Sequence, residues 1–263
     1  GLLLFKYFNM KLMLAVVLLE GVCQLVKDVI ALICVNKNNR NLTPNFKNID
    51  YRYSKEILGF GIQIFFMQIA ALVLNSTDNI IIMKYFGASD VTPYNMCHKY
   101  FSIINAFFVA AIGALWTTYT NAYILNDVKY IKETMKKTLL LYVITLFGII
   151  ISIIIFKPFM KFYLGKELIY QRGLIILVGF YYALLIFSHI FSSFVHGISK
   201  VKITTVACVI GALVNIPISI ALAVTFKMGL NGIILGSIIS LLINTIAYIY
   251  TTISEIKKME VRL

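Results

Sequence analysis

The chain has 263 residues, of which 60% are hydrophobic and only 13% charged, and its mean hydropathy is +0.88. Ordinary soluble domains are about 45–50% apolar and about 25% charged, so this composition excludes a soluble fold. The net charge of +13 comes from basic residues at the ends of apolar runs. This placement indicates membrane topology, and we expect no nucleic-acid partner.

The apolar runs are continuous, whereas the strands of a membrane β-barrel alternate polar and apolar residues over segments of about ten. One helical span needs about 20 apolar residues. The sequence therefore predicts an all-α polytopic transmembrane helical bundle with about seven spans, at residues 12–34, 57–83, 96–118, 138–156, 173–198, 203–226 and 230–251.

A long polar and basic connection separates the first predicted span from the six that follow closely. This spacing predicts a linker between two lobes. We expect residues 1–35 to hold the last helix of a truncated N-terminal lobe, residues 36–56 to be a cytoplasmic inter-lobe linker, and residues 57–263 to form a C-terminal six-helix lobe.

The basic residues are divided unevenly between the two sides of the predicted membrane. Fourteen lie in alternate connections and at the C-terminus, against nine on the opposite side. Because the richer side normally stays inside the cell, the C-terminus is expected to be cytoplasmic. The membrane would be the cytoplasmic membrane of a bacterium or archaeon.

Sequence motifs of enzymes and metal sites are absent from the chain. Its four cysteines form no CxxC pair, and neither GxSxG nor HExxH nor a Walker motif occurs. We expect no enzymatic activity, no metal and no cofactor. An acid inside the membrane is a candidate site for a coupling ion, H⁺ or Na⁺.

Polar side chains recur at helical spacing inside three of the predicted spans. Such groups normally face a bundle interior or a water-filled cavity, although any one of them can also be a hydrogen bond between neighbouring helices. Three stripes together favour a shared hydrated cavity. Its candidate residues, with Lys99 added as a fixed positive charge, are Gln68, Asn75, Asp78, Tyr94, His98, Lys99, Asn105, Trp116, Tyr182, His189 and His196.

Asp78 is the acid placed nearest the interior of the last six spans. Two interpretations of Asp78 stay open. It can couple an ion or contact substrate, or it can merely pair with a neighbouring helix or lie in the outer interface of the membrane. In the sixth span, Asn215 and Pro217 predict a helix kink, because proline lacks the backbone donor. The last span repeats Gly232, Gly236, Ser240 and Asn244, which is typical of close helix packing.

Two runs of sequence resemble a known family. They are TDNIIIMKYFGASDVTPYNMCHKYF at residues 77–101 and ALWTTYTNAYILNDVKYIKETMKK at residues 114–137, and MGLNGIILGSIIS at residues 228–240 adds a third similarity. The pattern is similar to that of oligosaccharide flippases of the Wzx or polysaccharide-transporter type, in the MOP exporter superfamily. The matching residues are Asp78, Phe86, Gly87, Val91, Tyr94, Trp116 and Asp127.

This resemblance implies one MOP-type six-helix lobe plus one preceding helix. It also implies that the protein flips undecaprenyl-pyrophosphate-linked oligosaccharide, such as an O-antigen, capsule or exopolysaccharide repeat unit, to the outer leaflet by alternating access. The implied partners are the lipid-linked oligosaccharide, membrane lipid, the missing N-terminal lobe and glycan-assembly proteins. Two alternatives stay open: a cation-coupled multidrug or small-molecule antiporter, and an integral-membrane glycan polymerase or transferase.

Overall fold

The computed structural model describes residues 18–34, 37, 51–165 and 169–261. Within these residues the secondary structure is helical and contains no β-strand, so the all-α prediction is confirmed. The chain divides into two units, Gly1–Lys55 and Glu56–Leu263. In the first unit, residues 18–34 form a helix. The remainder of the predicted first span and most of the predicted linker lie outside the described residues.

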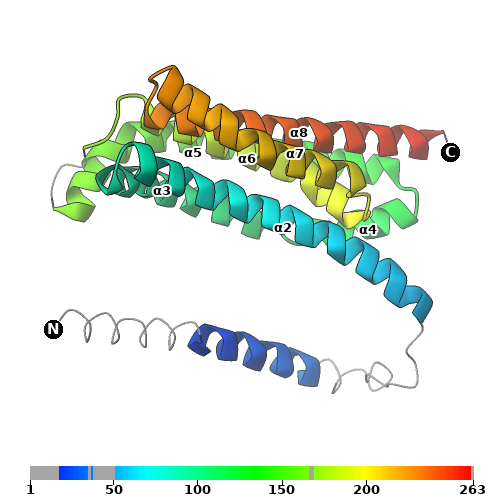
Figure 1. Ribbon diagram of the computed structural model, residues 1–263. Helices are drawn as coiled ribbons and strands as arrows, with labels where there is room; N and C mark the ends of the chain where they lie inside the picture. Colours follow the sequence, from blue (N-terminus) through cyan, green and yellow to red (C-terminus); the bar gives the residue numbers. More distant parts are fainter. Residues whose placement is uncertain (1–17, 35–36, 38–50, 166–168, 262–263) are drawn as a thin grey trace. The chain divides into compact units, whose positions relative to one another are not determined.

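The second unit contains the helices that position the candidate site (Figure 1). Six stretches of the described chain are long and apolar enough to cross a membrane, as predicted for the last six spans. The helices are α2 (Tyr51–Tyr85), α3 (Ala88–Ile112), α4 (Leu115–Ile124), α5 (Val128–Leu164), α6 (Leu174–Gly197), α7 (Lys202–Ile220), the π-helix η3 (Ala221–Thr225) and α8 (Leu230–Glu260).

Several helices are longer than the spans that the sequence predicts. The span predicted at 138–156 is the middle of α5, which begins at Val128 because Asp127 caps it by accepting a hydrogen bond from the backbone of Tyr130. The span predicted at 96–118 begins at Ala88 and is broken around Gly113 into α3 and α4. The α2 helix begins at Tyr51, inside the predicted linker. An apolar run locates the bilayer crossing, whereas helices extend beyond it into polar sequence.

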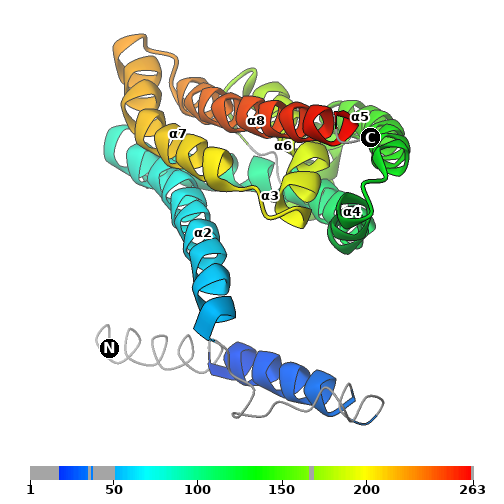
Figure 2. The same ribbon diagram turned by 90° about the vertical axis from the view of Figure 1, so that its right-hand side faces the viewer.

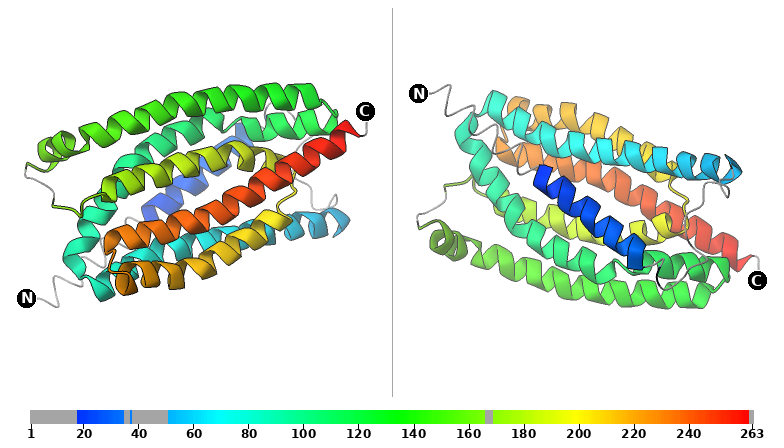
Figure 3. Two further views of the ribbon diagram at one scale, coloured as in Figure 1. Left: turned by 90° about the horizontal axis from the view of Figure 1, so that it is seen from above. Right: turned by 90° about the horizontal axis from the view of Figure 1, so that it is seen from below.

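Helices α6 and α8 form the centre of this unit. About half of the apolar window of each is buried, 50% and 56%, against 11% for α5. Figure 3 shows the reason, since α6 and α8 lie between α5 and α7. The exposed apolar side chains of α2 and α5 form the surface that would face lipid. This surface accounts for the high hydrophobic content of the chain.

Small residues bring α7 and α8 into close contact, and Figure 2 shows the two helices side by side. A Cβ added at Gly236 would lie 2.1 Å from Ser219 Oγ, and one at Gly232 would lie 2.5 Å from the backbone nitrogen of Ala223. The predicted packing role of this glycine repeat is therefore confirmed. The π-helix η3 continues α7 and begins at Ala221, four residues after Pro217.

Candidate functional site

Asp78 lies at the centre of a buried polar cluster. Its side chain is only 5% exposed, and its Oδ2 accepts hydrogen bonds from the Tyr94 hydroxyl at 2.7 Å and the Ser237 hydroxyl at 2.9 Å. The three residues belong to α2, α3 and α8. Hydrogen bonds to an ionised acceptor are the stronger kind, so the two hydroxyls can hold the carboxylate in a fixed position.

A fourth helix joins this cluster through Asn215 on α7. This side chain is fully buried, and its Nδ2 donates to Ser237 Oγ at 3.1 Å. Asn215 therefore orients the hydroxyl that donates to Asp78. The sequence associates Asn215 with a helix kink, whereas the structure shows it as part of the Asp78 cluster.

Local backbone features explain why these side chains meet. Gly87, at a φ of 103° that favours glycine, forms the turn between α2 and α3. The turn brings the two helices side by side, so that Asn95 also donates to Asn79, at 2.9 Å. On the other side, the glycine at 236 lets α8 approach α7 closely enough for Ser237 to reach both Asn215 and Asp78.

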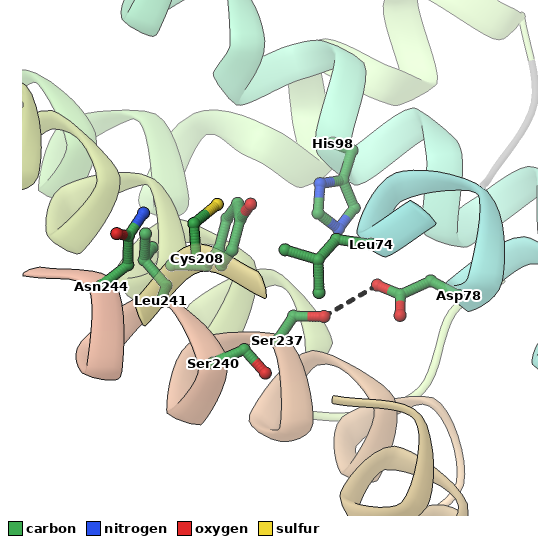
Figure 4. Close-up of a pocket in the computed structure, with 9 residues that line it drawn as sticks. Leu74, Asp78, His98, Cys208, Ser237, Ser240, Leu241 and Asn244 are labelled. Atoms are coloured by element: carbon green, nitrogen blue, oxygen red, sulfur yellow. Dashed lines mark hydrogen bonds between the residues drawn. The ribbon is translucent and has the colours of Figure 1, made fainter. Parts of the chain in front are cut away.

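A small cavity of about 50 Å³ lies beside Asp78 (Figure 4). Since about 10–15 Å³ of such cavity space is enough to hold one water, the cavity suits a few waters or a small ion. The residues that line it come from α2, α3, α6, α7 and α8. They are Leu74, Asp78, His98, Tyr181, Cys208, Ser237, Ser240, Leu241 and Asn244.

Three of the lining side chains hold a buried polar atom without a hydrogen-bond partner. These atoms are Asp78 Oδ1, His98 Nε2 and Asn244 Oδ1. Leaving such an atom unsatisfied costs about 1–3 kcal/mol, and native proteins contain few of them. Their convergence on one cavity indicates a place where a small polar species binds.

His98 is surrounded by aromatic rings. Its ring centroid lies 4.7 Å from that of Tyr94, 5.6 Å from Tyr181 and 5.7 Å from Tyr182. The predicted residues Asp78, Tyr94, His98 and Tyr182 therefore gather at one end of the α3–α6 contact.

A second polar group lies near the other end of α6. The His196 ring is 5.4 Å from Trp116, and its Nε2 is 3.1 Å from the Tyr248 hydroxyl. Trp116 remains 42% exposed. Asn105 and His189 each have a buried atom without a partner, Oδ1 and Nε2 respectively.

Three predicted cavity residues do not join either group in the described structure. Gln68 and Lys99 are exposed, and the side chain of Asn75 lies outside what the structure describes. Lys99 therefore supplies no positive charge to the Asp78 cavity, whose lining residues contain no lysine or arginine.

The sequence does not single out Ser237, Tyr181 or Cys208 as site residues. Ser237 follows Gly236 in a repeat that is typical of packing, and its bond to Asp78 spans 159 residues of sequence. The repeat does include Ser240 and Asn244, which line the cavity as well as pack. Intramembrane serines at a small-residue helix contact are the signal that would have suggested this position.

Comparisons with known proteins give two matching family models. The MatE model matches residues 64–221, more than half of the chain, and the model described as "Polysaccharide biosynthesis protein" matches residues 1–116. A protein of Salmonella typhimurium named "Putative O-antigen transporter" is 21% identical over 178 residues. That match covers 67% of this chain and 41% of the relative. No solved structure matches the chain.

Proposed function

We propose that this chain, which belongs to the MatE family, forms one lobe of a transporter that moves a lipid-linked oligosaccharide from the cytoplasmic to the outer leaflet. The name of the Salmonella relative and the polysaccharide biosynthesis model support this substrate class. The second lobe would come from sequence outside these residues, since the chain's match covers 41% of that relative.

The observation that carries the proposal is the buried Asp78 cluster inside a bundle with an apolar surface. An ionisable residue at membrane depth is costly and usually marks a transport or proton-relay site. Four helices contribute to this cluster, so a change in the charge of Asp78 can alter how α2, α3, α7 and α8 pack. In this proposal the repacking drives the movement of one lobe against the other by which alternating access works.

In this proposal the coupling ion and the oligosaccharide headgroup bind at separate sites. The cavity beside Asp78 holds only about 50 Å³, which suits a coupling ion, H⁺ or Na⁺. The larger headgroup would bind along the half-buried polar residues of α6, where His196 and the partly exposed Trp116 offer a hydrogen-bonding group and an aromatic face. The polyprenyl tail would remain in lipid.

A cation-coupled antiporter for drugs or other small molecules is the second candidate. The longer family match, to MatE, favours it, and the same ion site would serve it. An integral-membrane polymerase or transferase has less support, because the relative's name points to transport.

The experiment is deletion of the gene in its own host. The proposal predicts loss of surface glycan and accumulation of the polyprenyl-linked oligosaccharide inside the cell, both reversed by the complete gene. Unchanged surface glycan together with greater sensitivity to toxic compounds would reject the oligosaccharide and favour the antiporter.

A further inference from the structure

A row of polar residues extends from the Asp78 cavity along the contact between α3 and α6 and on to α4. Three contacts show that these segments run in the same direction. His98 meets Tyr182, Trp116 meets His196, and the Thr120 hydroxyl donates to the Gly197 carbonyl at 2.7 Å. Along these contacts the residue numbers of both partners rise together, from 98 to 120 and from 182 to 197, which is the sign of parallel packing.

Asn105 and His189 continue the polar positions along α3 and α6. Asn105 follows His98 by seven residues on α3, and His189 follows Tyr182 by seven residues on α6. Seven residues are two helical turns, about 10.5 Å along the axis. His196 follows after another two turns. The row therefore has three levels, each of which contains a histidine.

Unpartnered atoms mark the first two levels of this row. His98 Nε2, Asn105 Oδ1 and His189 Nε2 are all buried without a hydrogen-bond partner. An unpaired buried polar atom is costly, so we expect water or another small polar species between the helices to satisfy these atoms. At the third level, His196 Nε2 already has a partner in the Tyr248 hydroxyl.

We propose that the α3–α6 contact is a proton path that connects the Asp78 cavity with the end of the bundle where α6 leads into α7. This inference rests on the proposed transport function and names the proton as its coupling ion. His98, His189 and His196 would carry the proton, and Asn105 with water would bridge the gaps between them. Chains of acids and histidines are the usual proton relays of membrane proteins.

The chemistry suits a proton better than Na⁺. An imidazole can accept a proton on one ring nitrogen and release one from the other. A proton passed from His98 to Asp78 Oδ1 leaves a neutral imidazole and a neutral carboxyl group. Hard cations prefer a ligand set made of several oxygens. The cavity does offer oxygens from Asp78, Ser240 and Asn244, but Oδ2 of Asp78 is already occupied by two hydroxyl donors and His98 presents nitrogen (Figure 4), so its lining is mixed.

Few other charges would compete along the row. Tyrosine and cysteine side chains are ordinarily neutral near pH 7. Lys200 and Glu255 lie beyond the last histidine, in the connection after α6 and near the end of α8. The titratable groups on the surrounding helices include Asp78 on α2, Tyr94, Cys97, Tyr100 and the exposed Lys99 on α3, Tyr119 and Tyr123 on α4, Tyr142 on α5, Tyr181 and Tyr182 on α6, Cys208 on α7 and Tyr248 on α8.

The test uses the complete protein in liposomes that contain a trapped pH dye. A potassium gradient with valinomycin drives protons inward. The wild type should acidify the liposomes faster than protein-free liposomes do. His189→Gln, which keeps a polar side chain but cannot carry a proton, should slow the rate at least about tenfold, because one missing carrier interrupts a serial path.

Ser188→Ala is the matched control, since this buried residue precedes His189 on the same helix and lies outside the row. It should keep the wild-type rate. A wild-type rate equal to that of protein-free liposomes, or an unchanged rate in His189→Gln, would overturn the proton path.

Surface glycan is measured for the same variants in cells. Glycan export that persists in His189→Gln after the proton flux is lost would overturn the path as the coupling route and leave the proposed transport intact. Failure of the wild type to export any glycan would instead overturn the proposed function.

Discussion

Burying the charge of the Asp78 carboxylate at membrane depth is costly. Two hydroxyl groups are nevertheless positioned to stabilise this charge. A residue needed only for packing would be replaced by a neutral one with little loss. A residue that exchanges an ion would not tolerate the loss of its charge. The two cases therefore differ in a measurable way.

Asp78→Asn preserves the size of the side chain and its capacity for hydrogen bonds but removes the carboxylate. We expect this variant to reach the membrane at wild-type levels and to lose nearly all surface glycan. Asp90→Asn is the control, because Asp90 is an acid in the first turn of α3 outside the cluster. Wild-type glycan in the Asp78→Asn strain would reduce Asp78 to a packing role.

For the individual residues around Asp78, the sequence predicted about half of the polar cluster. Helical spacing pointed to Asp78, Tyr94, His98 and Tyr182, which the structure brings together. It did not point to Ser237 or to the hydrogen bond of Asn215, because these depend on how α7 and α8 pack against α2. Local periodicity identifies the polar face of one helix and cannot say which side chains on another helix meet it.

Among the helices, the contact of α7 with α8 is the one that most directly positions the cluster. A Cβ at residue 236 would approach Ser219 Oγ to 2.1 Å and its Cα to 2.9 Å, so any side chain there forces the helices apart. Ser237, on the next position, would move with them. The stability of this helix pair and the geometry of the Asp78 cluster are therefore linked.

Gly236→Ala should lower the free energy of unfolding by about 1–3 kcal/mol, the usual cost of overpacking. The measurement is the thermal unfolding temperature of the purified complete protein in detergent. Gly148→Ala provides the comparison, since a Cβ there meets nothing within 4 Å and alanine favours the helix. Equal unfolding temperatures for the two variants would refute the close α7–α8 contact.

The sequence located the last six spans but not the ends of their helices. Spans at 173–198 and 203–226 agree with α6 and with α7 plus η3 to within one or two residues. The extra turns of α5 and α8 contain lysines and glutamates, which are good helix formers yet fall outside a hydropathy window. A hydropathy window measures how favourably a segment transfers into lipid. It therefore locates the membrane crossing and not the ends of the helix.

For the whole molecule, the resemblance to polysaccharide transporters of the MOP superfamily is confirmed by the MatE and polysaccharide biosynthesis matches. The six apolar helices make it a multi-pass membrane protein. The division at residues 36–56 into linker and lobe stays a prediction, as does the side of the membrane that each end faces. Both depend on sequence and lipid that surround the described helices.

Orientation can be measured with single cysteines in a cysteine-free background. The uneven distribution of basic residues predicts that Lys129→Cys, at the start of α5, faces the cytoplasm and that the 88% exposed Ile169→Cys faces outward. A membrane-impermeant reagent applied to whole cells should label position 169 and spare position 129. The reverse pattern would invert the topology.

The central claim is that the complete protein moves a lipid-linked oligosaccharide between leaflets, and reconstitution tests it most directly. Liposomes containing the protein and the lipid-linked oligosaccharide are treated from outside with a glycosidase under an imposed proton gradient. With wild-type protein, we predict that the enzyme digests the whole pool, including molecules that began in the inner leaflet, whereas Asp78→Asn leaves the inner pool protected. Protection of the inner pool in wild-type and protein-free liposomes alike, with either a proton or a sodium gradient, would contradict the account.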